Sequence, residues 1–152
     1  MQAPFQDLVL PDGTCYGCGS ANPDGLQIKT TWNADRSAVV CTFHAAPFQT
    51  AGFPDTMQGG VLATVADCHS CWAAIAWAYR ADGREVGQGD PIVYVTAELA
   101  LQYLRPTPVS RPITLTAWVE GPVDRKVRTR CEVSDGAVTT AVADCRFVRV
   151  IG

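Results

Sequence analysis

The spacing of apolar and polar residues predicts one long helix and six strands. Residues 26–32 alternate apolar and polar side chains, and residues 37–43 form a second strand after the polar turn at 33–36. Together these two segments predict a hairpin. Four further strand patterns cover residues 92–104, 113–120, 126–133 and 137–150. The dipeptide Asp135-Gly136 predicts a tight turn between the last two strands.

Residues 59 to about 80 contain no proline and are dense in alanine. This composition predicts a helix of about 20 residues, roughly 30 Å long. Small or polar residues share one side of this helix at helical spacing: Gly60, Ala63, Thr64, Asp67, Ser70, Cys71 and Ala74. Larger apolar residues cover much of the rest, so the helix is expected to be buried nearly all round. A curved sheet around the helix is the natural cover, which predicts an α+β domain with one mainly antiparallel sheet.

The N-terminal segment has a different composition. Residues 1–25 are rich in Pro, Gly, Asp and Asn, and they include a Cys-x-x-Cys pair at Cys15 and Cys18. We expect mostly loop and turn in this segment, followed by a single domain over residues 26–152.

The whole-chain composition narrows the possible functions. With 47% apolar and 18% charged residues, the 152-residue chain is typical of a globular domain. The net charge of −3 gives no basic footprint for nucleic-acid binding. Seven cysteines, an odd number, and no apparent signal peptide favour free thiols in the cytoplasm. No uninterrupted apolar run reaches the roughly 20 residues of a membrane span, so we expect no membrane association.

Three segments of the chain resemble one family. Residues 58–67, from Gln58 to Asp67, resemble the start of the central helix in PaaI-like, hotdog-fold acyl-CoA thioesterases. In that family a His-Gly-Gly opens the helix and an acidic residue follows nine positions after the histidine. Residues 95–106 are similar to the strand that follows the helix and often ends in Leu-Arg-Pro. Residues 15–26 resemble an N-terminal Cys-x-x-Cys-Gly…Asn-Pro-x-Gly-Leu segment found in some members.

Asp67 is an acidic residue within an apolar helix. Burying an unpaired carboxylate is costly, so such a group has a partner, a raised pKa or a functional site. A core carboxylate satisfied by a hydroxyl or a backbone N–H is the alternative interpretation. The family resemblance implies catalysis, with Asp67 either attacking the thioester carbonyl or acting as general base on water. The sequence leaves both roles open.

The residues that open the helix are candidates for holding the thioester oxygen. Gly59 and Gly60 lie where backbone N–H groups are free at the positive end of the helix dipole. Close entry of the helix to the sheet is the alternative reason for glycine. The resemblance implies that the Gly59 N–H binds the thioester oxygen, with Gly60 beside it. Gln58 stands where the family usually has histidine; it can donate a hydrogen bond but cannot carry a proton between pH 5 and 8.

Four further residues are weaker site candidates. Thr96 lies early on the strand after the helix, where relatives often carry a hydroxyl near the attacking water, although a strand threonine is more often structural. Gln49 lies where relatives often place a polar side chain from the opposite subunit. Arg105 and Arg111 could bind the phosphates of coenzyme A, and surface solvation explains them equally well.

For His69 and the cysteines of the N-terminal segment and the helix, a structural role is expected. His69 lies two positions from Asp67, nearly on the opposite helix face, and is expected to be a core or interface residue. Cys15 and Cys18 have no second ligand pair at zinc spacing, so we expect a structural turn and no metal. Cys68 and Cys71 are expected to be small buried residues. No cofactor is expected apart from the coenzyme A portion of the substrate.

These interpretations predict an acyl-CoA thioesterase that releases a free acid and CoA. The resemblance implies homodimers or homotetramers with sites shared at the dimer interface, and pairing would cover the edges of a six-stranded sheet. A non-catalytic acyl-CoA binding module is the alternative. A hotdog dehydratase ranks lower because neither histidine is well placed beside the acid.

Overall fold

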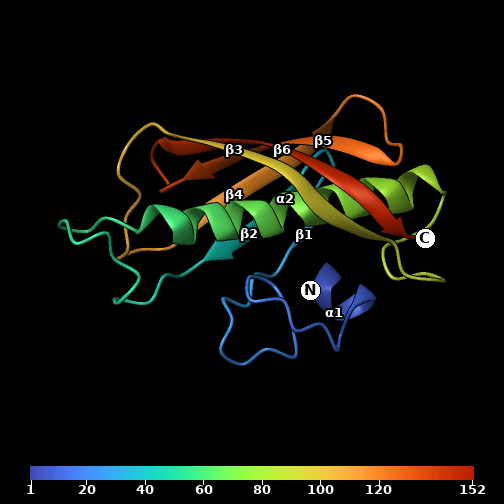
Figure 1. The fold of residues 1–152 in the computed structure, drawn as a ribbon, viewed down its shortest axis with the longest axis horizontal. Helices are drawn as coiled ribbons and strands as arrows, with labels where there is room; N and C mark the ends of the chain where they lie inside the picture. The colour runs from blue at the N-terminus through green and yellow to red at the C-terminus, as the bar shows by residue number, and fades with distance from the viewer.

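A six-stranded antiparallel sheet curls around one long helix in the computed structural model, which describes residues 1–152 (Figure 1). The strand order across the sheet is β1-β2-β4-β5-β6-β3, so β1 and β3 form the two edges. The elements in chain order are α1 (Phe5–Val9), β1 (Thr31–Trp32), β2 (Val39–Phe43), α2 (Gly59–Ala81), β3 (Val93–Tyr103), β4 (Ile113–Glu120), β5 (Lys126–Ser134) and β6 (Thr139–Ile151). The predicted α+β hotdog architecture is confirmed.

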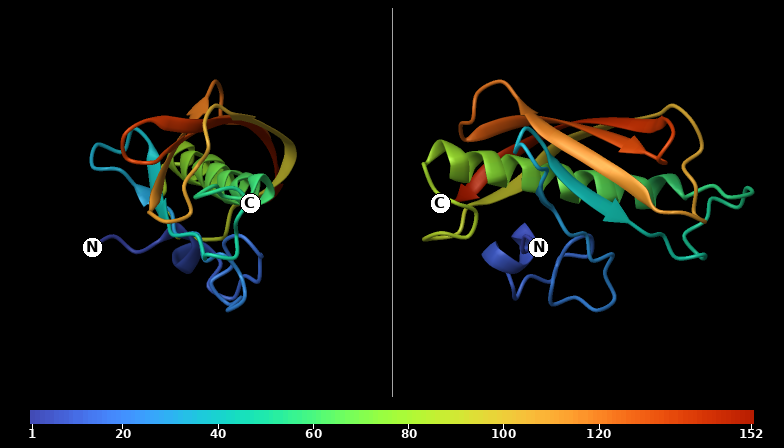
Figure 2. Two further views of the ribbon diagram at one scale, coloured as in Figure 1. Left: turned by 90° about the vertical axis from the view of Figure 1, so that its left-hand side faces the viewer. Right: turned by 180° about the vertical axis from the view of Figure 1, so that it is seen from behind.

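The central helix α2 fills the concave face of the sheet, and the end-on view in Figure 2 shows the strands curving around it. Its large side chains, such as Leu62 and Trp72, are buried together with most of its alanines. The expectation that it is buried nearly all round is wrong along one stripe. Gly60 is exposed, and the small or polar residues Ala63, Thr64, Asp67 and Cys71 are only partly buried. This stripe runs beside β3, the edge strand, beyond which no further strand covers the helix.

Helix α2 is long and apolar enough to cross a membrane by length and composition alone. Within the fold, however, 67% of its most apolar 18-residue window is buried. Most of this window is therefore already covered by the rest of the protein.

The first predicted strand is much shorter than its sequence pattern suggests. Only Thr31 and Trp32 pair with β2. The backbone N–H groups of Leu26 and Ile28 instead donate to carbonyl oxygens in the Cys15–Cys18 loop. Gln27 between them has a φ of 56°, a left-handed conformation that interrupts an extended strand.

The N-terminal segment is mostly loop and turn, as expected, but it also contains a short helix, α1, that was not predicted. Phe5 and Val9 of this helix belong to the same apolar core as α2. The Phe5 N–H donates to the Thr30 carbonyl at 2.9 Å, and the Phe5 ring packs edge-on against Trp32. Because these stabilising contacts come from distant residues, local composition did not reveal the helix.

His69 joins three parts of the chain, as expected for a core histidine. Its Nε2 lies 3.2 Å from the Val39 carbonyl, and its Nδ1 lies 3.0 Å from the Thr30 hydroxyl. A carbonyl only accepts, so Nε2 carries the proton and the Thr30 hydroxyl donates to Nδ1. Burial lowers the pKa of His69 to about 4, which keeps the ring neutral near pH 7. Gln6 of α1 completes the network through two hydrogen bonds with Thr30.

Candidate active site

Asp67 and Thr96 form a pair at the open stripe of α2. The Thr96 hydroxyl donates a hydrogen bond of 2.8 Å to Asp67 Oδ1, while Oδ2 accepts no hydrogen bond from the protein. Partial burial raises the pKa of Asp67, and the hydrogen bond from Thr96 opposes that rise. The carboxylate is therefore oriented at one oxygen and free to react at the other.

A β-bulge in β3 directs Thr96 toward Asp67. Thr96 pairs with Phe147 and Glu98 pairs with the adjacent Arg146, so Ala97 is the extra residue of the bulge. Phe147 is fully buried, whereas the Arg146 and Glu98 side chains are more than 60% exposed and form an ion pair of 3.4 Å. Simple alternation would place Thr96 and Glu98 on one face, and the bulge places them on opposite faces.

The N-terminus of α2 presents two unpaired backbone donors. Gln58 is the N-cap, and its Oε1 accepts a hydrogen bond of 2.8 Å from the Val61 N–H. The N–H groups of Gly59 and Gly60 donate to no protein acceptor. A Cβ on Gly60 would lie 2.9 Å from Gln58 Oε1, so glycine makes room for the cap. Two N–H groups at the positive end of a 23-residue helix suit a developing oxyanion.

Tyr103 is a site residue that the sequence analysis missed. Its hydroxyl donates a hydrogen bond of 2.6 Å to the Gly59 carbonyl, and a Cβ on Gly59 would lie 3.2 Å from that hydroxyl. The end of β3 is thereby fixed against the start of α2. No signal in the sequence indicated it, because an odd spacing from Thr96 predicts the opposite face of a regular strand and only the bulge brings both residues onto one face.

A hollow of about 450 Å³ opens at this end of the helix. Its lining is mainly apolar and includes Met57, Gly59, Leu62, Tyr103 and Arg105. Arg105 is exposed and has no ion-pair partner, so its guanidinium is free to bind an anion. Gly59 and Arg105, two residues predicted for the site, thus line one hollow.

Two other predicted residues have partners elsewhere. Arg111 forms an ion pair of 2.9 Å with Asp135 at the β5–β6 turn. Gln49 is buried, and its Oε1 accepts from the Ala46 N–H within its own loop. The Gln49 carbonyl also accepts from the Gln58 N–H, so this loop supports the helix start from within the same chain.

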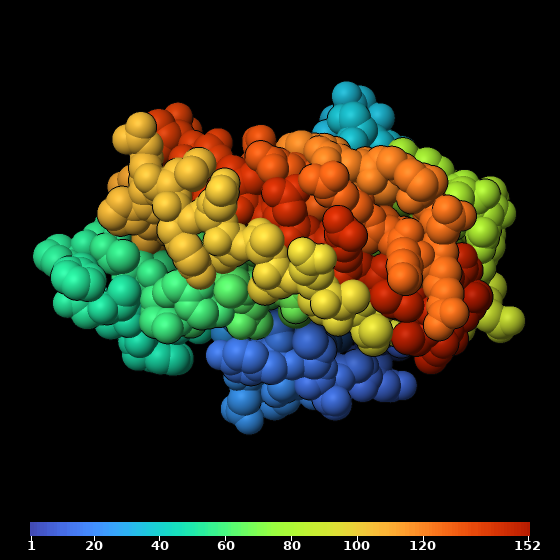
Figure 3. All heavy atoms as spheres, turned by 45° about the horizontal axis from the view of Figure 1, so that its top comes forward, coloured from blue at the N-terminus to red at the C-terminus, as the bar shows by residue number.

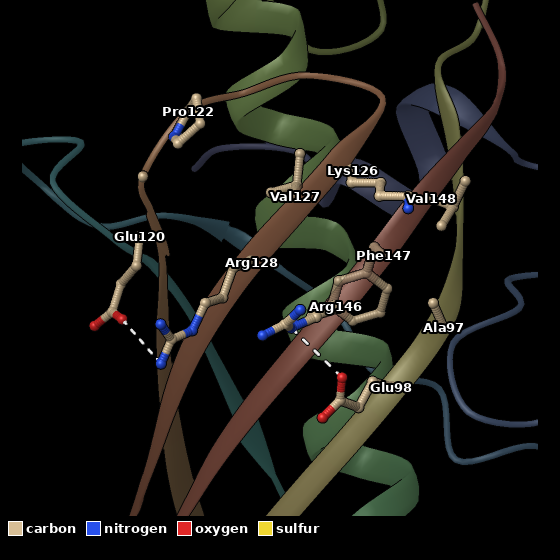
Figure 4. Close-up of a pocket in the computed structure, with 11 residues that line it drawn as sticks. Ala97, Glu98, Glu120, Pro122, Lys126, Val127, Arg128, Arg146, Phe147 and Val148 are labelled. Carbon is tan, nitrogen blue, oxygen red and sulfur yellow. Dashed lines mark ion pairs between the residues drawn. The ribbon is translucent and has the colours of Figure 1, made fainter.

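A larger hollow of about 520 Å³ lies on the sheet between β3, β6 and the β4–β5 turn (Figure 4). Its lining combines apolar residues such as Phe147 with charged side chains. Four of the charged side chains form ion pairs, Glu98 with Arg146 and Glu120 with Arg128. Asp67 is not among its lining residues. The candidate active site therefore remains the open stripe of α2, where Asp67 Oδ2 and the Gly59 and Gly60 N–H groups have no hydrogen-bond partner.

Asp67 and the Gly59 N–H of one chain do not meet at one carbonyl. They lie eight residues apart on α2, a separation of about 12 Å along the helix axis. A nucleophile and an oxyanion donor must both lie about 3 Å from the reacting atoms. Within a single chain the two groups are therefore too far apart to act on the same carbonyl.

The comparisons with known proteins identify the family. The model of the thioesterase superfamily matches residues 55–142, more than half of the chain. The solved structure of a thioesterase superfamily protein from Shewanella loihica is 27% identical, with 86% of this chain and 97% of that chain covered and a TM-score of 0.66. No curated protein matches the chain.

Two more distant structures share the fold. The Escherichia coli PaaI protein of the phenylacetic acid degradation operon is 19% identical over 82% of this chain and 80% of its own, with a TM-score of 0.63. A Streptococcus mutans protein bound to acetyl-CoA is 13% identical over 82% and 89%, also with a TM-score of 0.63. The family match and these folds lead to one conclusion. The chain belongs to the thioesterase superfamily and has the hotdog fold predicted from its sequence.

Proposed function

We propose that this protein hydrolyses an acyl-CoA thioester to a carboxylic acid and free CoA. The observation that carries the proposal is Asp67, held by Thr96 at one oxygen and open at the other on the uncovered stripe of α2. Membership of the thioesterase superfamily supports hydrolysis of a thioester. The acetyl-CoA bound to the Streptococcus mutans protein of the same fold favours CoA as the thiol.

The proposed chemistry needs only an acid and a backbone donor. As general base, Asp67 takes a proton from water while the water oxygen attacks the thioester carbon. As nucleophile, the carboxylate attacks that carbon itself and water then cleaves the resulting anhydride. In either case a Gly59 N–H holds the oxyanion, the carbon–sulfur bond breaks, and CoA leaves as a thiolate that takes up a proton. The side-chain amide N–H of Gln58 is a further donor at this end, since its backbone N–H is already bonded to the Gln49 carbonyl.

We further propose that two copies pair through β3 to complete the site. Strand β3 is an edge, and it carries exposed apolar side chains at Val95 and Leu99. β3 runs antiparallel to α2, because Thr96 contacts Asp67 and Tyr103 contacts Gly59. A two-fold axis near the middle of β3 would therefore place Asp67 of one copy beside Gly59 of the other. The 12 Å separation within one chain would then become a contact between chains.

Arg105 is the proposed contact for the CoA phosphates. It lines the hollow at the start of α2 and has no carboxylate partner. A free guanidinium binds phosphate in bidentate geometry. Arg111, also predicted from the sequence, is less suited because Asp135 already occupies its guanidinium.

The test is hydrolysis of phenylacetyl-CoA and a series of fatty acyl-CoAs by the wild type and Asp67→Asn. Free CoA is measured by chromatography, because the exposed Cys15 thiol would react with thiol reagents. We expect turnover by the wild type and a loss of at least 100-fold in Asp67→Asn, with binding retained. Asp12→Asn, a change at an exposed turn, is the matched control. If the wild type binds acyl-CoA but hydrolyses it no faster than Asp67→Asn does, the protein is a binding module and not an enzyme.

A further inference from the structure

Three cysteines from two distant parts of the chain meet beside α2. Cys15 and Cys18 lie in the N-terminal loop, and Cys68 lies on the helix. Their three Sγ atoms all lie within 4.8 Å of one another. The loop belongs to the N-terminal segment, which lies against α2 on the side away from the sheet (Figure 1 and Figure 3). Cys68 is fifty residues from Cys18 in the sequence, so spacing alone indicates only the pair Cys15 and Cys18.

The thiol spacing matches that of ligands on one metal ion. Cys15 Sγ and Cys68 Sγ are 3.8 Å apart. Two thiolates on a tetrahedral zinc ion, with Zn–S bonds of about 2.3 Å, lie about 3.8 Å apart. The Cys-x-x-Cys spacing of Cys15 and Cys18 is the spacing of one half of a zinc site.

The loop is held in place by its own backbone. The Gly19 N–H donates to the Cys15 carbonyl at 2.8 Å, which closes the turn that carries both thiols. The Leu26 and Ile28 N–H groups donate to the carbonyls of Tyr16 and Gly17. The two loop cysteines are therefore oriented without any contribution from a bound ion.

Glycine at position 17 permits the close approach to the helix. A Cβ at this position would lie 2.1 Å from Cys68 Sγ and 3.2 Å from the Thr64 methyl carbon. Any larger residue would push the loop away from Cys68. The Trp72 indole N–H donates to Cys18 Sγ at 3.3 Å, the kind of outer contact that orients a ligating thiolate.

We propose that Cys15, Cys18 and Cys68 bind one Zn²⁺ ion as a three-thiolate site that ties the N-terminal loop to α2. Thiolate sulfur is a preferred zinc ligand, and three protein ligands leave the fourth tetrahedral position to water or another small ligand. Cys68 directly follows Asp67 in α2, so the ion would also fix the helix beside the proposed catalytic residue. The proposal depends on the cysteine cluster alone and stands apart from the thioesterase activity.

The test uses the full chain, reduced and metal-free, titrated with Zn²⁺ against a competing chelator. We expect one Zn²⁺ per chain, and at least a tenfold loss of affinity in each of Cys15→Ser, Cys18→Ser and Cys68→Ser. Cys71→Ser is the matched control, since Cys71 lies one turn along the same helix and its thiol faces the Tyr94 carbonyl instead. This variant should bind Zn²⁺ as tightly as the wild type.

A second readout needs no variant. Cys15 is exposed, while Cys18 and Cys71 are both partly buried. Zn²⁺ should slow alkylation of Cys15 and Cys18 in the reduced wild type and leave the rate at Cys71 unchanged, as read by peptide mass spectrometry. The proposal would be overturned if the wild type bound no Zn²⁺. It would also be overturned if Zn²⁺ protected Cys15, Cys18 and Cys71 equally, or protected none of them.

Discussion

The Thr96 hydroxyl lies 2.8 Å from Asp67 Oδ1, and a β-bulge at Ala97 is what brings it there. The contact connects an edge strand to the central helix at the one stripe of α2 that the sheet leaves uncovered. It fixes one carboxylate oxygen and leaves the other free, which is the arrangement that a general base or a nucleophile requires.

Replacing Thr96 by valine should lower kcat by about 10- to 100-fold. The variant keeps the shape of the side chain and removes a hydrogen bond to a charged group, worth about 1.5–3 kcal/mol. Thr96→Ser keeps the hydroxyl and should retain most of the activity. Steady-state kinetics with the preferred acyl-CoA measures both variants. If valine left kcat intact, or serine were as damaging as valine, the hydroxyl would have no part in positioning Asp67.

Arg105 and Arg111 should differ in their effect on substrate binding. Arg105→Gln is expected to raise KM for acyl-CoA about tenfold, because it removes a free cation from the hollow beside Gly59. It should leave KM for the corresponding acyl-pantetheine unchanged, since that substrate lacks the nucleotide phosphates. Arg111→Gln should leave both KM values unchanged, because Asp135 already pairs with Arg111. An equal effect of both variants on both substrates would contradict this assignment.

Asp135 should make stability depend on pH below about 4. Hydrogen bonds from the Val138 and Ala137 N–H groups and from Arg111 lower the pKa of Asp135 to about 2, compared with 3.8 for an ordinary aspartate. A depressed folded-state pKa stabilises the fold above the unfolded value, and this stability is lost as the pH falls from about 4 toward 2. Asp135→Asn should unfold at lower urea concentration at pH 6, and the difference should shrink by pH 2.5. A difference that is constant over this range would show that the carboxylate charge does not matter.

Gly17→Ala should weaken Zn²⁺ binding while leaving all seven thiols in place. The added Cβ would lie 2.1 Å from Cys68 Sγ, so the loop must move away from α2. Because Gly17 does not have a positive φ, the effect comes from this contact rather than from backbone strain. Chelator competition should show at least a tenfold loss of affinity. If the affinity equalled that of the wild type, Zn²⁺ binding would not depend on the close approach of the Cys15–Cys18 loop to Cys68.

The sequence predicted the parts of the fold that depend on local pattern. The 23-residue helix, the four C-terminal strands and the turn at Asp135-Gly136 all lie where periodicity placed them. The short helix α1 was not predicted, and the first strand begins at Thr31 instead of the predicted residue 26. In both cases contacts from distant residues decide the conformation, through Thr30 for α1 and through Tyr16 and Gly17 for residues 26–28.

For the candidate site, the sequence predicted individual residues rather than their contacts. Asp67 and Thr96, each predicted for the site, lie in contact, although their pairing was not predicted, and the N–H groups of Gly59 and Gly60 are free at the start of the helix. Tyr103 was missed because its role depends on how β3 meets the start of α2. Cys68 was missed as a neighbour of Cys15 because only the fold brings residues so far apart in sequence together.

The central claim is that Asp67 of one copy acts with the Gly59 N–H of another. Gly59→Pro tests the donor, because proline fits the first helical position and has no N–H. Gly59→Ala adds the same Cβ but keeps the N–H, so it controls for the added carbon. Gly59→Pro and Asp67→Asn should each be at least 100-fold less active than the wild type. Gly59→Ala should retain most of the activity.

The most direct measurement is the activity of these two inactive variants after they are unfolded and refolded together in equal amounts. In a mixed dimer one of the two sites would have both an intact Asp67 and an intact Gly59. Random pairing should therefore restore about one quarter of wild-type activity. Mixed dimers seen by native mass spectrometry with no activity above that of the separate variants would contradict the shared site.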